Sequence, residues 1–452
     1  MQIKQLKIVS LYGYLTKDIY FNEDLTLLVG INGSGKTSIL NILNWMLKPS
    51  LPNLCVIEFK VIELFFVFNN IDYKIICKHN KTSFTYNVKC SKDKFAPLVI
   101  RLKTPPLEIV SEDQKKSLLQ VYSSLSPEAK EKKTWDFIEA LPSPNVIGLD
   151  RNLFTEEADR LYVDGSFTSR RIVPSEISSR SPLSRVEEIV NQEYRKRKNA
   201  VLNLTSKLKN QLMLSAFDGS ITIDALTADV RHKLKLNQIE GAEKRVKEYF
   251  TNIEKGVFND SEQETVSKYF AQLKDVIQQY QLRPNDEHVK LLYSLNTRQF
   301  IKVNRLLKEF EKFENDSNEV LQGINTYIDT LNYFLKDSAK RLVFKEDTAE
   351  IKFNNLDKNG DVISGFNNIK FLSSGEQQIL ILFSYVAFNS QDGKIFIIDE
   401  PELSLHIKWQ EDFLAQLERV TPKATQLILA THSPILVSKR KDKAKLLLPY
   451  NG

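Results

Sequence analysis

The chain has 452 residues, of which 42% are hydrophobic and 27% charged, so its composition indicates a globular protein large enough for two or three domains. Its formal net charge of +6 suits a nucleic-acid partner without requiring one. No stretch approaches the roughly 20 apolar residues that span a bilayer, and no apolar leader follows Met1, so we expect a cytoplasmic protein without a membrane partner.

The N-terminal residues predict strands that lead into a glycine-rich loop and a helix. Apolar and polar residues alternate over 3–8, and residues 18–21 and 25–29 are typical of two more strands. The helical pattern that follows Thr37 is expected to end before Pro49.

Residues 55–88 predict an antiparallel β lobe. β-branched and aromatic residues dominate 56–68 and 73–77, and asparagines mark the turns. Three cysteines lie in this region without the close spacing of a zinc site or a redox pair, so we expect reduced core residues at Cys55, Cys77 and Cys90.

The middle of the chain, from about residue 175 to 340, predicts charged helices that carry two apolar stripes. The first stripe consists of Leu183, Val186, Val190, Tyr194, Val201, Leu204, Leu208 and Leu212. The second consists of Leu306, Phe310, Phe313, Val320, Ile324, Tyr327, Leu331 and Phe334. Because both have helical spacing, they can pair as an antiparallel coiled-coil hairpin. We therefore expect a helical insertion over residues 156–340, between the two halves of one α/β domain at 1–155 and 341–452.

The C-terminal part returns to an α/β pattern. Strand character resumes at residues 344–353 and 362–371, and a buried helix is predicted for 379–388. The last predicted strands are 395–398 and 427–430.

The loop after residue 29, Gly-Ile-Asn-Gly-Ser-Gly-Lys-Thr, fits the P-loop pattern GxxxxGK[ST] between a strand and a helix. Glycine lets the backbone curl so that its N–H groups converge on phosphate at a helix N-terminus. Lys36 is expected to reach the β and γ phosphates of ATP, and the Thr37 hydroxyl to coordinate Mg²⁺. The predicted nucleotide-binding residues of this loop are Gly30, Asn32, Gly33, Ser34, Gly35, Lys36, Thr37 and Ser38.

The apolar strand at residues 395–398 ends in two carboxylates, Asp399 and Glu400. Ligands bind at the carboxyl ends of parallel strands, so both acids should face the nucleotide. Asp399 is expected to hold Mg²⁺, and Glu400 to orient and deprotonate the attacking water.

Residues 372–377, Leu-Ser-Ser-Gly-Glu-Gln, precede a predicted helix and resemble the signature of ABC-type ATPases. The predicted contact residues are Ser373, Ser374, Gly375 and Glu376, and a helix N-terminus again suits an anion. In that family the phosphate at the signature belongs to the other subunit. The resemblance therefore implies a homodimer or a higher even-numbered oligomer that clamps ATP between two copies.

Residues 431–434, Thr-His-Ser-Pro, resemble the switch-histidine segment of OLD-like and RecF-like ATPases, which implies that His432 senses the γ-phosphate. Residues 401–406 resemble the D-loop region of the same proteins, with Ser404 to His406 at the subunit interface. A simple loop before a helix explains these residues as well.

Two features leave alternatives open. No glutamine stands in an obvious Q-loop context, and the nearest candidates for a role near the nucleotide are Asp150 and Arg151, which a structural salt bridge also explains. The basic run Arg195–Lys198, with Lys207 and Lys209, can contact DNA or RNA phosphates, but interspersed glutamates favour a solvated helix face.

Together these motifs resemble the SMC/RecF/OLD-like branch of ABC-type ATPases, and most closely the AAA15/AAA21 ATPases of bacterial anti-phage systems, such as the Septu ATPase PtuA and its retron-associated relatives. The resemblance implies a slow ATPase that senses infection and controls a separate nuclease of the HNH type. Because the chain stops soon after the switch histidine, we expect no built-in nuclease. The alternatives are a RecF/SMC-like DNA-repair ATPase and a PARIS-type ATPase that holds a Toprim nuclease.

Overall fold

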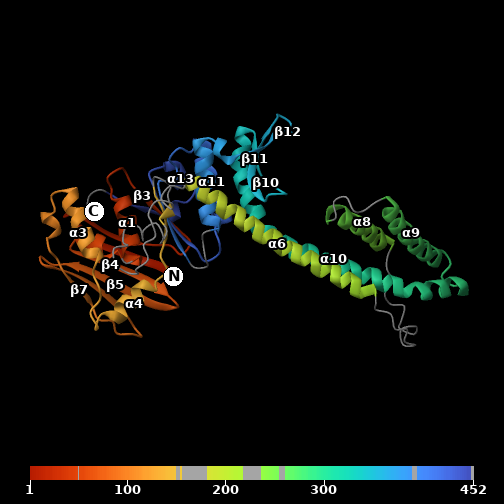
Figure 1. Cartoon of the computed structure of the whole chain (residues 1–452), viewed down its shortest axis with the longest axis horizontal. Helices are drawn as coiled ribbons and strands as arrows, with labels where there is room; N and C mark the ends of the chain where they lie inside the picture. The colour runs from red at the N-terminus through yellow and green to blue at the C-terminus, as the bar shows by residue number, and fades with distance from the viewer. Residues whose placement is uncertain are drawn as a thin grey trace. The chain divides into compact units, whose positions relative to one another are not determined.

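The computed structural model describes residues 1–48, 50–148, 153–154, 181–216, 236–253, 260–388 and 394–448. The chain divides into two compact units (Figure 1). Unit 1 comprises Met1–Glu193 and Ile324–Gly452, and unit 2 comprises Tyr194–Gly323. Asp150 and Arg151 lie outside the described residues, so their predicted role stays a prediction.

Unit 1 contains a six-stranded sheet with the order β15-β3-β14-β13-β8-β9, parallel except for β9. Every residue of β13 and β14 is buried, as expected for strands covered on both faces. The carboxyl ends of these parallel strands meet at one edge. The strands are β3 (Leu25–Val29), β8 (Asn145–Ile147), β9 (Leu153–Phe154), β13 (Ile395–Asp399), β14 (Gln426–Thr431) and β15 (Ala444–Leu446).

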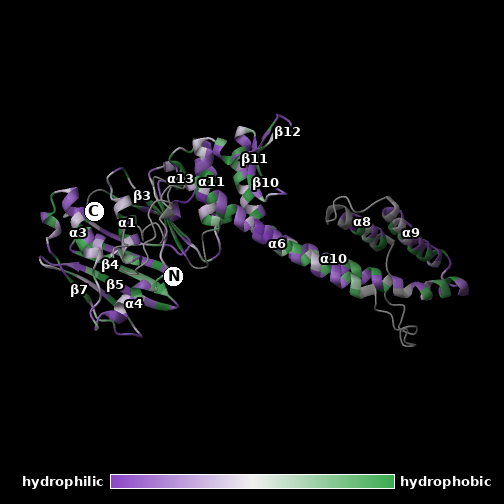
Figure 2. Cartoon of the chain, viewed as in Figure 1, coloured by the Kyte–Doolittle hydropathy of each residue, from purple (hydrophilic) through white to green (hydrophobic). Residues whose placement is uncertain are grey.

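A second, antiparallel sheet has the order β2-β1-β4-β5-β6-β7, which confirms the predicted β lobe. Buried and part-exposed residues alternate along β4 and β6, and Figure 2 shows hydrophobic and hydrophilic residues mixed along the strands of the lobe. The strands are β1 (Gln2–Leu11), β2 (Leu15–Tyr20), β4 (Val61–Phe68), β5 (Ile71–His79), β6 (Ser83–Cys90) and β7 (Leu98–Arg101).

The lobe corrects one expectation, because residues 51–56 form helix α2 (Leu51–Val56) and the strand begins only at Val61. Pro52 lies in the first turn of α2, where its fixed φ favours a helix. Cys55 is therefore a buried helical residue, and Cys77 is a buried strand residue. Helices α1 (Lys36–Leu47), α3 (Glu112–Ser123) and α4 (Lys132–Glu139) also belong to this half of unit 1.

The C-terminal half contributes a three-stranded antiparallel sheet and a buried helix. The predicted strand at 344–353 is in fact two strands, β10 (Lys340–Lys345) and β11 (Glu350–Leu356), because the chain turns at Ala349, where φ is 55°. Strand β12 (Val362–Asn367) ends before the 3-10 turn η3 (Ile369–Phe371), so the strand expected to reach residue 371 is shorter. The buried helix is confirmed as α11 (Ser374–Phe388). Helices α12 (Ile407–Val420) and α13 (Pro434–Ser438) follow, and strand β15 was not predicted.

The predicted helical insertion is confirmed by long helices between the two halves of the α/β core. Arg197 of α6 donates a hydrogen bond of 2.7 Å to the Val320 carbonyl of α10, and its guanidinium lies against Gly323. Leu208 and Phe310 share one apolar cluster, so α6 and α10 pair in antiparallel register. The helices are α6 (Pro182–Ala216), α8 (Leu236–Ile253), α9 (Asp260–Leu282) and α10 (Glu287–Leu335). Within the part of the chain that the structure describes, every helix is too short or too polar to cross a membrane.

Candidate nucleotide and catalytic site

The loop between β3 and α1 has the backbone geometry that the P-loop pattern predicts. Gly35 caps α1 in the left-handed region, with φ 90°, which favours glycine. A Cβ at Gly35 would lie 2.7 Å from Leu15 Cδ2, and one at Gly30 would lie 2.7 Å from the carbonyl oxygen of Leu447. The fold therefore has room only for glycine at both positions.

Lys36 folds back into this loop. Its side chain is 5% exposed, and its Nζ donates to the Gly30 carbonyl at 2.9 Å and to the Ile31 carbonyl at 3.3 Å. The same Nζ lies 3.4 Å from Glu400 Oε1. The ammonium thus connects the P-loop with the carboxylate that follows β13.

Thr37 and Asp399 meet across the P-loop and the end of β13. Thr37 Oγ1 donates a 2.7 Å hydrogen bond to Asp399 Oδ2. Asp399 Oδ1 is buried and has no hydrogen-bond partner among the described residues. Burial raises the pKa of Asp399 above its ordinary value, against the effect of the hydrogen bond from Thr37. A hydroxyl and a carboxylate with a spare oxygen are hard donors of the kind that Mg²⁺ prefers.

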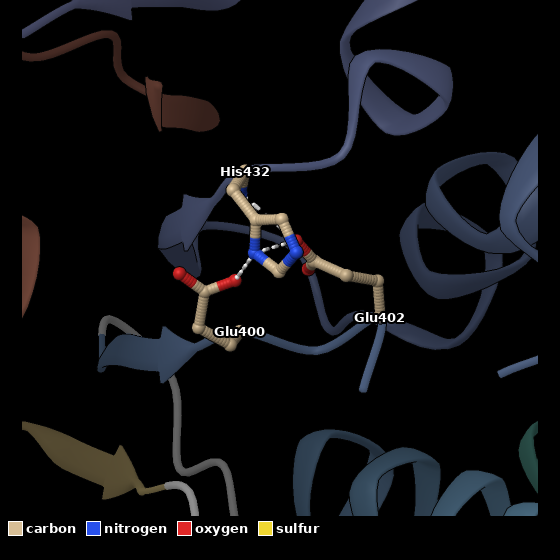
Figure 3. A group of neighbouring side chains, drawn as sticks. All are labelled: Glu400, Glu402 and His432. Atoms are coloured by element: carbon tan, nitrogen blue, oxygen red, sulfur yellow. Dashed lines mark hydrogen bonds and ion pairs between the residues drawn. The ribbon is translucent and has the colours of Figure 1, made fainter. Parts of the chain in front are cut away.

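Glu400, Glu402 and His432 converge where β13 and β14 end (Figure 3). His432 Nδ1 forms a short contact with Glu400 Oε2 and lies 3.3 Å from Glu402 Oε1. Glu400 has φ 47°, and its N–H donates to the Ala430 carbonyl at 2.9 Å, which ties the two strand ends together. One atom from each side chain lies within 4.8 Å of the others, a spacing that also suits a cation, although acid groups commonly lie together without one.

The two glutamates of this group have opposite electrostatic settings. Burial acts to raise the pKa of Glu400, but its contacts with Glu402 and His432 and the charges of His432 and Lys36 outweigh burial and set that pKa below its usual value. Burial raises the pKa of Glu402. When the pKa values of two neighbouring acids differ in this way, the acid with the lower pKa stays ionised and can act as a base.

Glu402 is the residue of this site to which the sequence assigned no role. It is 4% exposed and accepts hydrogen bonds from the Thr431 side chain and from the N–H groups of His432 and Ser433. The signals in the sequence were its place after Asp399-Glu400-Pro401, beside the predicted catalytic acid, and its position in the segment 401–406 that resembles the D-loop region.

The signature segment forms the start of α11. Ser373 N–H donates to Glu376 Oε2 at 2.6 Å, and Ser373 Oγ accepts from Glu376 N–H at 3.4 Å, which is the reciprocal arrangement of a capping box. Ser373 and Ser374 are exposed at the start of α11, whereas Gly375 and Glu376 of the same turn are buried. A Cβ at Gly375 would lie 2.8 Å from the Ser404 carbonyl oxygen, so the signature and the D-loop pack at van der Waals contact.

The Glu376 carboxylate has partners inside the protein. It is 2% exposed, and it accepts from Lys340 Nζ at 3.0 and 2.8 Å and from Ser338 Oγ at 2.6 Å. Burial opposes ionisation, but these hydrogen bonds and the Lys340 charge hold the pKa of Glu376 below its usual value. The geometry gives this carboxylate a structural task, and its predicted contact with nucleotide stays a prediction.

The D-loop residues Ser404 to His406 lead directly into α12. Ser404 has φ 67°, and His406 caps α12 by accepting a hydrogen bond from the Lys408 N–H at 3.3 Å. The loop is thus a helix start that also contacts the signature, and its role at a subunit interface stays a prediction. The basic run on α6 is part of the helical hairpin at Arg197, and its contact with nucleic acid likewise stays a prediction.

The chain is similar to one protein family and to individual relatives. The family model described as AAA ATPase domain (AAA_15) matches residues 1–437. The Retron Vc95 probable ATPase of Vibrio cholerae serotype O1 biovar El Tor is 28% identical over 187 residues, which cover 38% of this chain and 35% of that protein. The Retron Ec83 probable ATPase of Escherichia coli is 36% identical over 107 residues, which cover 20% of this chain and 19% of that protein. Only a part of each relative's length is therefore matched.

Two solved structures align over most of the chain at low similarity. One is the Smc head domain with an extended coiled coil bound to the C-terminal domain of ScpA, from Pyrococcus furiosus, with a TM-score of 0.31 and 12% identity over 97% of this chain and 91% of that one. The other is SmcHead bound to the C-winged helix domain of ScpA, with a TM-score of 0.37 and 9% identity over 97% of this chain and 92% of that one.

Proposed function

Because the chain belongs to the AAA ATPase domain family (AAA_15), whose model it matches over residues 1–437, we propose that it hydrolyses ATP with Mg²⁺ as the regulatory subunit of an anti-phage defence complex. The observation that carries the hydrolytic part is the convergence of three groups at one sheet edge. Lys36 lies inside the P-loop, Thr37 donates a hydrogen bond to Asp399, and Glu400 contacts His432.

Each of these residues has a task that its contacts support. The P-loop N–H groups and Lys36 would bind the β and γ phosphates, and Thr37 and Asp399 would hold Mg²⁺. Bound Mg²⁺ would neutralise charge that develops on the phosphate oxygens. Glu400, kept ionised by its surroundings, would orient and deprotonate the attacking water, and His432 would contact the γ-phosphate.

A second copy of the chain is proposed to complete the site. The exposed Ser373 and Ser374 at the N-terminus of α11 form an anion site that contacts the D-loop through Gly375 and Ser404. A γ-phosphate held by the P-loop of one copy would be contacted by this segment of the other. ATP would then hold two copies together, and hydrolysis would release them.

The defence role is supported by the relatives, which are named as probable ATPases of retrons, and by the resemblance of the motifs to PtuA-like ATPases. The proposed partner is a separate nuclease of the HNH type, held in check by the ATPase. The proposed task of this chain in such a complex is to control the nuclease, because its own site is suited to nucleotide hydrolysis.

The enzymatic part is tested with Lys36→Ala and Glu400→Gln. We expect both variants to lose steady-state phosphate release, because one removes a phosphate ligand and the other the general base. Light scattering should show that Glu400→Gln accumulates as an ATP-bound dimer while Lys36→Ala stays monomeric. Normal turnover by either variant would reject the site assignment.

The defence part is tested by purifying the chain together with the products of its neighbouring genes, with and without ATP. A stable nuclease partner on an even-numbered ATPase assembly supports the proposal. A lone protein that dimerises with ATP and retains DNA would replace it with a DNA-repair function of the RecF/SMC type.

A further inference from the structure

Glu402 places a buried carboxylate between the loops that follow β13 and β14. Its Oε1 accepts hydrogen bonds from Thr431 Oγ1 at 2.5 Å, from His432 N–H at 2.9 Å and from Ser433 N–H at 3.0 Å. Three consecutive residues are therefore fixed by one oxygen of a side chain that is 4% exposed. Removing this acceptor would leave buried donors without a partner, so this segment depends on Glu402 for its position.

The same oxygen also faces the imidazole of this segment. His432 Nδ1 lies 3.3 Å from Glu402 Oε1, on the side of the ring that contacts Glu400 Oε2 (Figure 3). Glu402 thus contacts both the backbone and the ring of His432. The ring also contacts Glu400, the proposed general base.

The segment has further anchors on the side away from Glu400. Ser433 Oγ donates to Gln410 Oε1 at 2.7 Å and accepts from the Leu436 N–H at 3.4 Å, which fixes the start of α13 against α12. These bonds hold Ser433, but they do not set the orientation of the His432 ring. That orientation depends on the two glutamates.

We propose that Glu402 is a positioning residue that fixes the switch segment Thr431–Ser433 and thereby holds His432 against Glu400. This inference rests on the proposed ATPase function, because His432 and Glu400 act on the γ-phosphate and its attacking water. Among the described residues, Glu402 forms no hydrogen bond with Lys36 or Thr37, so its substitution should lower turnover and spare ATP binding.

The test compares Glu402→Ala with Glu402→Gln in the full-length chain. The amide oxygen of Glu402→Gln can accept the same hydrogen bonds, whereas Glu402→Ala offers no acceptor. Misplacing a catalytic group by about 1 Å can cost about 100-fold in rate, so we expect Glu402→Ala to lower kcat by that order with KM for ATP near the wild-type value. Glu402→Gln should restore most of kcat. Glu418→Gln, an exposed acid of α12 paired with Arg440, is the matched control and should behave as wild type.

A second measurement separates this inference from the proposed function. Amide hydrogen exchange without nucleotide should show that the His432 amide loses protection in Glu402→Ala and keeps it in Glu402→Gln. The Ser433 amide, which also donates to Thr431 Oγ1 at 3.0 Å, should respond less. Unchanged protection in Glu402→Ala overturns the positioning role, as does equal loss of kcat in both variants. A wild-type chain that hydrolyses no ATP would instead reject the proposed function and leave the exchange result to decide this inference. If Glu402→Ala does not fold, Thr431→Val replaces it. That variant removes one of the three donors to Glu402 Oε1, but it also removes the second acceptor of the Ser433 N–H, so its readout is the His432 amide alone. The His432 amide should lose protection, and a protected His432 amide overturns the proposal.

Discussion

The ion pair between Lys340 and Glu376 tests how the signature helix is held. Lys340 Nζ lies 3.0 and 2.8 Å from the two Glu376 oxygens, and the exposed side-chain fractions are 20% for Lys340 and 2% for Glu376. Removing one partner of a buried pair leaves the other charge unpaired and costs about 3–5 kcal/mol. Because Lys340 keeps some contact with water, we expect Lys340→Met to lower the free energy of unfolding by about 3 kcal/mol, the low end of that range.

Urea unfolding followed by tryptophan fluorescence is the appropriate assay. The three tryptophans of the chain, Trp45, Trp135 and Trp409, all lie in unit 1, so the signal reports the unit that contains the ion pair. The matched control is Lys345→Met on the same strand, where the pair with Asp347 has exposed fractions of 36% and 65%. An exposed pair of this kind contributes less than about 1 kcal/mol.

The difference in unfolding free energy between wild type and Lys340→Met should also depend on pH. The folded-state pKa of Glu376 lies below its usual value, so its stabilisation is present above the unfolded pKa and is lost as pH falls through the folded pKa. The difference between wild type and Lys340→Met should therefore be largest at neutral pH and shrink in acid. A double-mutant cycle with Glu376→Gln should give a coupling energy of at least about 1 kcal/mol. A coupling near zero, or a difference that is the same at neutral and acid pH, would refute the reasoning.

Two further predictions follow from close packing and from burial of charge. Gly375→Ala should lose about 1–3 kcal/mol of unfolding free energy and weaken ATP-dependent dimerisation, because its Cβ would meet the Ser404 carbonyl at 2.8 Å. Gly241→Ala on α8, where a Cβ meets nothing within 4 Å, should instead raise the free energy of unfolding by up to about 1 kcal/mol. Circular dichroism during urea unfolding compares the two variants. Equal effects of the two substitutions would contradict this account. Asp399→Asn should abolish ATP turnover and yet raise the melting temperature at neutral pH, because it removes a buried carboxylate charge for which the described residues supply one hydrogen-bond donor, Thr37. Calorimetry and phosphate release measure the two effects, and a lower melting temperature would count against the burial argument.

Local sequence patterns were sufficient where chemistry and backbone geometry coincide. The P-loop needs glycines at fixed spacing before a helix, and Gly35 indeed caps α1 with φ 90°. The apolar residues of β13 likewise indicated a buried strand that ends in acids, and the structure places Asp399 at that end. In each case the pattern lies within a few consecutive residues, so no tertiary information was needed.

Features that depend on distant partners were missed. Strand β15 pairs with β3 in parallel, and its three residues carry too little periodicity to be recognised alone. Helix α2 lies in an apolar stretch that also suits a strand. The helix is favoured because it buries Leu51 and Leu54 against the core. The hydrogen bonds of Glu402 join residues 29 to 31 positions apart, which no local pattern encodes.

Glu376 shows why a motif position does not by itself give a side chain its task. The signature pattern places this residue beside the predicted phosphate contacts Ser373 and Gly375. In the structure its carboxylate caps the first turn of α11 through Ser373 N–H and pairs with Lys340, so it fixes the backbone of the proposed anion site. A glutamate at the third helical position suits both tasks in a sequence. Only the burial of its carboxylate, and the lysine brought to it by the chain after α10, distinguish them.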